Sequence, residues 1–111
     1  MSKKGHSKEA SLRRLYKSYI YDCRCVNRFF GLSLKEFLEI VQSPCHYCGA
    51  PPSNMNRVKY SGIDRKDNDK GYESGNVCAC CKRCNSIKGE YLTYKQMLIV
   101  SKALKKARGE A

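Results

Sequence analysis

Two Cys-x-x-Cys steps are the strongest chemical signal in the sequence. Cys45 and Cys48 form the first step, and Cys81 and Cys84 form the second. A gap of two residues lets both thiolates of a step bind one ion, and four thiolates complete a tetrahedral, structural zinc site. Cys78 and Cys81 have the same spacing, but we favour Cys84 because Cys78 then lies on a strand as a small apolar side chain. The spacing therefore predicts Zn²⁺ bound by Cys45, Cys48, Cys81 and Cys84.

The rest of the chain favours a metal site over disulfides. Residues 1–8 contain no apolar signal segment, and no apolar run approaches the length of a membrane span. We therefore expect a cytoplasmic protein, because a reducing compartment keeps paired thiols available for metal. Cys23 and Cys25 lie one residue apart in a predicted helix, so their sulfur atoms diverge and we expect both to be unpaired.

The charge balance indicates the kind of partner. Lys and Arg number 22 against 10 Asp and Glu, which gives a formal net charge of +12. Nucleic acid is the usual partner of a small domain with such an excess, and a merely soluble basic surface is the alternative. The 41% hydrophobic share of the 111 residues includes eight Cys and eight Tyr. A single domain of this composition therefore needs more than apolar burial to fold.

The N-terminal part of the chain predicts a pair of helices. Residues 1–6 have the composition of a disordered basic tail. Apolar positions then recur at three- and four-residue steps over residues 7–30, with Gly31 at the expected C-cap. The aromatic residues expected in the core are Tyr16, Tyr19, Phe29 and Phe30. Ser33 and Glu36 form the sequence of a capping box for a second helix.

The C-terminal part predicts a β-hairpin between the Cys-x-x-Cys steps. Strand-like runs at residues 58–65 and 76–80 flank a loop rich in Gly, Asn and Asp. A short helix is expected to start near Cys84. Thr93 and Gln96 form a second capping box, which opens a C-terminal helix. The predicted class is therefore α+β.

The central segment resembles a known family. The string GIDRKDNDKGYESGNVCACCKRCNSIKG, preceded by CHYCG, is similar to the HNH endonuclease superfamily, the ββα-metal nucleases, in its zinc-stabilised phage and restriction branch. The likeness covers about residues 45–89, and the preceding helix with LSLKEFLEI resembles the N-terminal part of phage HNH proteins more weakly. It implies a small zinc-stabilised ββα-metal core at residues 44–111, preceded by a helical segment at residues 7–43.

The resemblance also assigns roles to four positions. Asp64 falls on the acid that binds the catalytic ion, Asn76 on the middle Asn that braces the loop, and Asn85 on the final metal-binding position. The implied catalytic ion is Mg²⁺ or Mn²⁺. The general-base His of the family falls on Arg65, so this sequence departs from the family at the residue that would accept the proton.

Arginine cannot accept a proton at neutral pH, because the pKa of its side chain lies above about 12. Some restriction enzymes of the superfamily resemble this sequence in carrying Asp-Arg at the same place. There the guanidinium would clamp the phosphate or favour ionisation of a neighbouring tyrosine, for which Tyr72 is the first candidate. The alternatives are Tyr60, Tyr47, and water activated by Asp67 or His46. The site could also be inactive.

The expected function is that of a metal-dependent DNA endonuclease of the HNH type. A monomer would nick double-stranded DNA and a homodimer would cut both strands, in the host cell cytoplasm if the protein is phage-encoded. The expected phosphate contacts are Lys66, Lys70, Lys82, Arg83 and Lys88. The main alternative is a catalytically inactive, zinc-stabilised nucleic-acid-binding module. A small interaction protein is a third possibility, and the basic charge argues against it.

Overall fold

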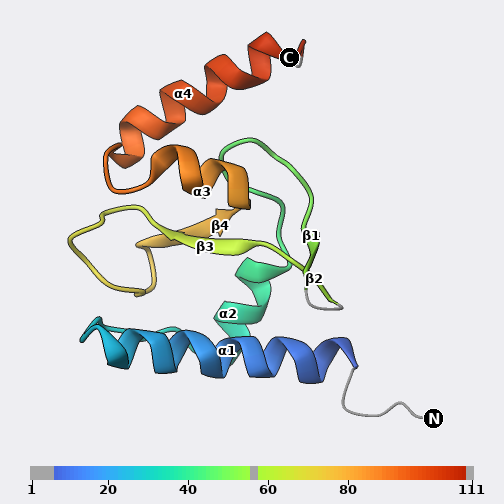
Figure 1. Cartoon of the computed structure of the whole chain (residues 1–111), viewed down its shortest axis with the longest axis vertical. Coiled ribbons are helices and arrows are strands. Elements are labelled where there is room, and N and C mark those ends of the chain that lie inside the picture. Colours follow the sequence, from blue (N-terminus) through green and yellow to red (C-terminus); the bar gives the residue numbers. More distant parts are fainter. Residues whose placement is uncertain (1–6, 56–57, 110–111) are drawn as a thin grey trace.

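The computed structural model describes residues 7–55 and 58–109, so the basic tail expected at residues 1–6 lies outside the described residues. The elements are α1 (Lys8–Cys25), α2 (Leu34–Val41), β1 (Ser53–Met55), β2 (Val58–Tyr60), β3 (Gly62–Arg65), β4 (Val77–Cys80), α3 (Lys82–Lys88) and α4 (Tyr94–Ala107). The β3–β4 hairpin forms a middle layer, with α1 and α2 on one side and α3 and then α4 on the other (Figure 1). The predicted α+β class is confirmed. None of the helices described is long and apolar enough to cross a membrane.

Helix α1 is shorter than the sequence pattern predicts. Its N-cap, Ser7, accepts a hydrogen bond from the backbone N–H of Ala10 at 3.1 Å. The helix ends at Cys25 rather than Phe30, because Asn27 adopts a left-handed backbone with φ of 56°. The chain beyond it is extended, and Phe30 pairs with Tyr72 in an isolated parallel bridge.

The residues after α1 therefore differ from the prediction in two respects. Gly31 is not a helix cap, since its N–H donates to the Tyr72 carbonyl at 2.8 Å. Phe29 is 61% exposed, so its expected place in the aromatic core is wrong. Phe30 does pack in that core, with its ring centroid 5.6 Å from that of Tyr16.

Of the two predicted capping boxes, one forms in full and the other forms only in part. In α4, Thr93 and Gln96 form the predicted reciprocal capping box. In α2, the Ser33 hydroxyl accepts the N–H of Glu36 at 3.1 Å. The Glu36 carboxylate instead accepts a hydrogen bond from the Ser74 hydroxyl at 2.8 Å, which ties α2 to the loop between β3 and β4.

The predicted strand at residues 58–65 is divided into two strands that belong to different sheets. β2 pairs antiparallel with β1, and β3 pairs antiparallel with β4. The division falls at Ser61, which is 3% exposed. Its N–H donates to the Val41 carbonyl at 2.7 Å and its hydroxyl donates to the Ser43 carbonyl at 2.7 Å. The end of α2 therefore takes the backbone bonds that a continuous strand would have used.

The hairpin separates two cores and directs alternate side chains into each. Asp64 pairs with Cys78, and Ile63 pairs with Ala79. Because successive strand residues point to opposite faces, Asp64 and Cys78 face α3, whereas Ile63 and Arg65 face α1. The α1-side core contains Leu12, Leu32, Phe37, Val41, Val58 and Ile63. The α3-side core contains Cys45, Tyr47, Cys48, Cys78, Cys80, Cys84 and Met97. The second core is therefore built largely from thiols.

Candidate active site and metal centre

Four cysteines from two distant segments meet in the α3-side core. The Sγ atoms of Cys45, Cys48, Cys81 and Cys84 all lie within 4.8 Å of one another. The first pair sits in a turn closed by the Gly49 N–H, which donates to the Cys45 carbonyl at 2.9 Å. The second pair lies at the start of α3, which begins at Lys82 rather than near Cys84 because Cys81 is its N-cap. Cys78 is outside the cluster.

The spacing and chemistry of the four thiols fit a single metal ion. A tetrahedral zinc with Zn–S bonds of about 2.3 Å places its sulfur atoms about 3.8 Å apart, and the Cys48 and Cys81 sulfur atoms are 3.6 Å apart. The neighbouring Cys80 thiol is the largest cause of a pKa lowered to about 3 at Cys45. Burial raises the pKa of Cys84. Four thiolates this close together would repel one another, so a cation bound between them would stabilise the cluster.

The other cysteines lie outside this cluster of four sulfur atoms, although the Cys80 thiol forms a hydrogen bond with Cys45. All eight are free thiols in the described chain, with Cys23 buried and Cys25 exposed. Cys78 and Cys80 are buried on β4, and burial raises the pKa of Cys78 to about 11. They therefore behave as small apolar side chains of the strand.

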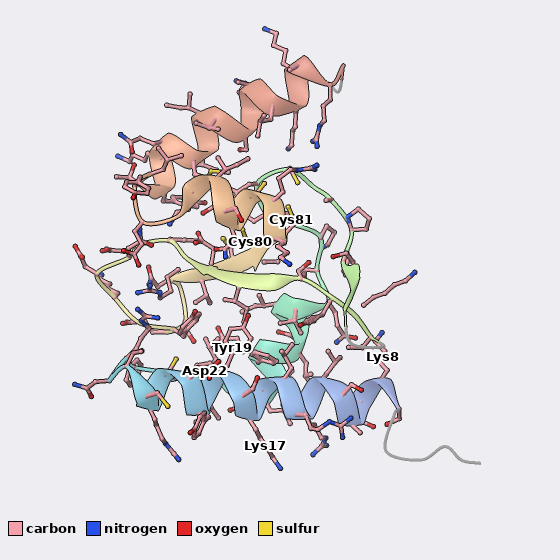
Figure 2. All side chains as sticks on the ribbon, viewed as in Figure 1. Lys8, Lys17, Tyr19, Asp22, Cys80 and Cys81 are labelled. Carbon is pink, nitrogen blue, oxygen red and sulfur yellow. The ribbon has the colours of Figure 1, made fainter. Side chains whose placement is uncertain are left out.

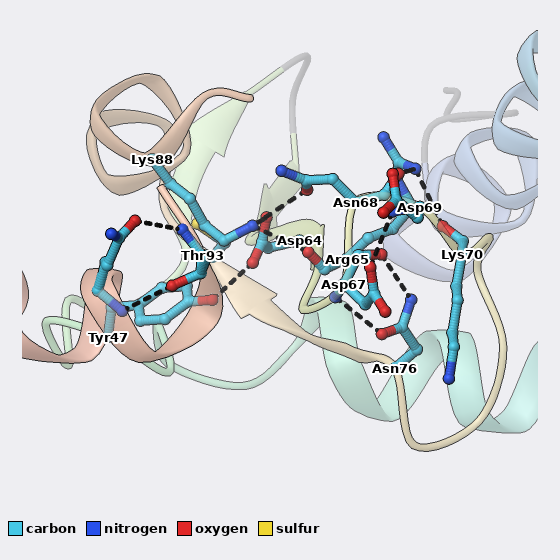
Figure 3. Close-up of polar contacts among 12 residues, drawn as sticks. Tyr47, Asp64, Arg65, Asp67, Asn68, Asp69, Lys70, Asn76, Lys88 and Thr93 are labelled. Carbon is cyan, nitrogen blue, oxygen red and sulfur yellow. Dashed lines mark hydrogen bonds and ion pairs between the residues drawn. The ribbon is translucent and has the colours of Figure 1, made fainter. Parts of the chain in front are cut away.

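Asp64 is the most enclosed acidic residue of the site, with 5% of its surface exposed. The Tyr47 hydroxyl donates to Oδ2 of Asp64 at 2.6 Å. The Lys88 ammonium lies 3.3 Å from Oδ1. Figure 3 shows the carboxylate between these two side chains, one from the first cysteine turn and one from the end of α3. The charge of Asp64 is therefore neutralised and its orientation fixed.

The position of Lys88 in the structure differs from the surface position that the sequence predicted. Its side chain is fully buried, so it is not the surface phosphate contact that we expected. Besides the pair with Asp64, Nζ donates to the Arg65 carbonyl at 3.0 Å and to Oδ1 of Asn68 at 3.1 Å (Figure 3). Lys88 follows Cys84 by four residues and so shares its face of α3, but this spacing alone does not indicate that a lysine there is buried.

Tyr47 is held as a hydrogen-bond donor. Its side chain is 2% exposed. Burial is the main cause that raises the pKa of Tyr47, and the hydrogen bond to Asp64 adds to it. A phenol with a raised pKa keeps its proton. Tyr47 therefore orients Asp64, and this geometry disfavours its use as the base.

Arg65 and Tyr72 form a pair on the opposite face of β3. Nη1 of Arg65 donates to the carbonyl oxygens of Asn68 at 2.8 Å and Lys70 at 3.0 Å. The guanidinium carbon lies 5.7 Å from the centre of the Tyr72 ring. Burial raises the pKa of Tyr72, and the charge of Arg65 opposes that rise. Tyr72 also packs edge-on against Tyr19 at 5.7 Å, so it serves the aromatic core as well.

Asn76 spans the loop between β3 and β4. Its Oδ1 accepts the N–H of Asp67 at 2.9 Å, and its Nδ2 donates to the carbonyl of Gly71 at 2.9 Å. The side chain is 8% exposed. These bonds add to the backbone bond from the Lys66 N–H to the Asn76 carbonyl at 2.7 Å, and they hold the segment that supplies the acceptors of Arg65.

Asn85 is exposed at the surface of α3, whereas Asp64 is buried. It lines a cleft of about 270 Å³ together with Tyr60, Ile63 and Tyr72. The side chain of Asp64 is not among the lining groups, although Ile63 precedes it in β3. The structure therefore brings Asn85 and two candidate tyrosines to one cleft, with Asp64 on the adjacent face of the strand.

The remaining cations predicted to contact phosphate stay at the surface. Lys70, Lys82 and Arg83 are exposed, and Lys66 is half-buried. The Lys66 ammonium lies 5.2 Å from the centre of the Tyr94 ring, a distance typical of a cation–π contact.

A β-hairpin that carries an acid on its first strand and leads into a short helix with a surface amide is the arrangement of the ββα-metal fold. The rare-cutting HNH restriction endonuclease PacI has a similar structure, with a TM-score of 0.72 and 24% sequence identity over 90% of this chain and 82% of that chain. This likeness confirms the predicted resemblance at the level of the fold.

The sequence comparisons add one relative. An uncharacterized protein of Acanthamoeba polyphaga mimivirus is 40% identical over 62 residues, which are 56% of this chain. The chain spans 11% of the length of that relative. No family model matches the sequence.

Proposed function

We propose that this protein is a metal-dependent DNA endonuclease of the HNH type, which nicks or hydrolyses a phosphodiester bond. The observation that supports this most directly is the likeness of the fold to that of the restriction endonuclease PacI, with Asp64 and Arg65 carried by β3 and Asn85 carried by α3. The four-cysteine site would hold Zn²⁺ and tie the start of α3 to the turn that carries Tyr47.

Asp64 and Asn85 offer the oxygen donors that Mg²⁺ or Mn²⁺ prefers. Each oxygen of Asp64 has one contact, with Tyr47 or Lys88, and retains a lone pair for an ion. The exposed carboxamide of Asn85 offers the second oxygen. The bound ion would polarise the phosphate and stabilise the charge on the leaving oxygen. Lys88 and Tyr47 would hold the carboxylate in a fixed orientation during this chemistry.

Arg65 and Tyr72 would take the place of the missing histidine. Only Nη1 of the guanidinium is engaged by the loop carbonyls, so other N–H groups can bind a phosphate oxygen. The same charge favours the ionised form of Tyr72 against the effect of burial. Burial still leaves the pKa of Tyr72 raised. Tyr72 is our first candidate for the group that receives the proton because of its contact with Arg65. Asn76 would hold the loop that positions this pair.

The proposed substrate is double-stranded DNA. The net charge of +12 supports a polyanionic partner. Lys66, Lys70, Lys82 and Arg83 would contact phosphates, and each contact would steepen the dependence of log K on log salt by about 0.9. Cleavage of both strands at once would use a homodimer, because the described residues of one chain form one such site.

Replacing Asn85 with Ala is expected to abolish plasmid relaxation without unfolding the protein. Its side chain is exposed, so its loss leaves the cores intact. The loss of a metal ligand should reduce the rate by about 100-fold or more. Purified protein is incubated with supercoiled plasmid and Mg²⁺ or Mn²⁺, and relaxed circles are quantified. Ser86→Ala, at the neighbouring exposed position of α3, is the matched control and should retain activity. A folded Asn85→Ala variant as active as the control contradicts the proposed role.

An inactive nucleic-acid-binding module is the second candidate, and Arg65 in place of histidine favours it. Replacing Arg65 with His distinguishes the two functions. If the parent cleaves, the variant should cleave about 10-fold less or worse, since the ring cannot reproduce the two loop bonds and a small displacement costs rate. Gain of plasmid relaxation from an inactive parent instead supports the module. A gel-shift assay with both proteins checks that the substitution leaves DNA binding unchanged.

A further inference from the structure

A basic groove lies between the first cysteine turn and α4, away from the cations assigned above. We call it the α4 groove; its walls include His46, Tyr47, Ser101, Lys102, Lys105 and Lys106. Its volume is about 440 Å³. Three of these lining side chains end in ammonium groups, and none of them ends in a carboxylate. The groove therefore presents a concentrated positive charge to solvent.

No acidic side chain of α4 compensates this positive charge. Residues 94–107 contain four lysines and no acidic residue. Lys102 and Lys106 are both exposed and stand one turn apart on the same face of the helix. Like charges at this spacing repel each other and destabilise a helix, so an anion between them is favourable. A neighbouring hollow near the start of α4 differs, because Asp67, Asp69 and Glu90 line it beside its lysines.

The α4 groove is physically connected to the Asp64 site. Tyr47 forms part of its wall and donates to Asp64 at 2.6 Å. On the rim, Nε2 of His46 lies 2.7 Å from the hydroxyl of Tyr94, and the two rings stack. Lys66 in turn lies over the Tyr94 ring. A chain of cations and aromatic rings therefore extends from the segment that follows β3 to the groove.

We propose that the α4 groove binds the phosphate backbone of duplex DNA next to the segment held at the Asp64 site. The identification of DNA as the ligand rests on the proposed function. Lys102 and Lys106 would contact phosphate oxygens. Such contacts fix the register of DNA on the protein and carry no sequence preference of their own. The groove would therefore supply positioning and affinity, and the hairpin side would supply the chemistry.

The test compares two double variants of equal net charge. Lys102→Gln with Lys106→Gln removes the two exposed groove cations. Lys8→Gln with Lys17→Gln removes two exposed cations from α1, on the far side of the molecule, where Figure 2 shows Lys17 pointing outward. Affinity for a short duplex is measured by fluorescence anisotropy over a salt series, with no Mg²⁺ or Mn²⁺ added.

The groove variant should reduce the slope of log K against log salt by about 1.8, for two lost phosphate contacts. The α1 variant should keep the slope of the parent. Equal losses in both variants, or an unchanged slope in the groove variant, overturn the proposal. So does a groove variant that loses affinity for single-stranded RNA but retains it for duplex DNA. If the parent binds DNA as expected but never cleaves it, the endonuclease proposal is wrong and the groove proposal is unaffected.

Discussion

Replacing Cys48 with Ser is expected to unfold the part of the protein built around the four-cysteine cluster. The α3-side core consists mainly of thiols, with Tyr47 and Met97 as its large side chains. Structural zinc contributes about 10–16 kcal/mol of binding free energy in small domains, whereas a whole domain is stable by only about 5–15 kcal/mol. Loss of one thiolate ligand should therefore remove cooperative thermal unfolding and reduce the zinc content per chain.

The matched control for this variant is Cys78→Ser. Cys78 is also a buried thiol of the same core, but it lies outside the cluster of four sulfur atoms. Its replacement should cost about 1–3 kcal/mol, the typical effect of burying an extra hydroxyl, and should leave the metal content unchanged. Circular dichroism melts and elemental analysis measure the two effects. Equal stability and equal metal content in Cys48→Ser and the parent contradict a structural metal site.

A chelator provides the same test without mutation. Ligand thiols must be deprotonated to bind metal, so acid and chelation should act together. The parent should lose its cooperative melt in excess chelator, and mild acid should lower the chelator concentration required. Restoration of the melt by added Zn²⁺ separates loss of metal from irreversible damage to the chain.

Local signals in the sequence predicted most elements of the fold. The capping box of Thr93 and Gln96, the hairpin and the two cysteine steps depend on residues close together in the chain, and they form as their patterns indicate. The end of α1 depends on distant residues. Phe30 continues the helical spacing, but its pairing with Tyr72 draws it into an extended segment. Periodicity contains no information about such a distant partner.

The same limit applies to the candidate site. Strand alternation places Asp64 on the face opposite Arg65, and this follows from local sequence once the strand is known. The sequence alone does not show that Ser61 bonds to the end of α2, because its partner carbonyls belong to another element. Nor does it show where Lys88 points. A lysine is usually at the surface, and only the convergence of a carboxylate, a carbonyl and an amide oxygen makes its burial favourable.

Replacing Lys88 with Met is expected to destabilise the protein by about 3–5 kcal/mol, which is the typical cost of leaving one partner of a buried ion pair uncompensated. Met retains the length of the side chain, so the effect reports the lost charge and hydrogen bonds rather than a cavity. Asp64 would lose its counter-charge at 3.3 Å, and the Arg65 carbonyl and Asn68 amide would lose their donor. The free energy of unfolding from urea titrations measures the change.

Lys82→Met is the matched control, because Lys82 is an exposed lysine of the same helix and its loss should change stability by less than about 0.5 kcal/mol. The double variant Lys88→Met with Asp64→Asn should be more stable than the sum of the single changes predicts, since it removes both buried charges together. Additive effects would mean that the two groups do not interact in solution. If the double variant is folded and fails to relax plasmid while a folded Lys88→Met variant relaxes it, then the loss of activity reflects the missing carboxylate rather than unfolding. The pair would thus separate the structural role of Lys88 from the proposed metal-binding role of Asp64.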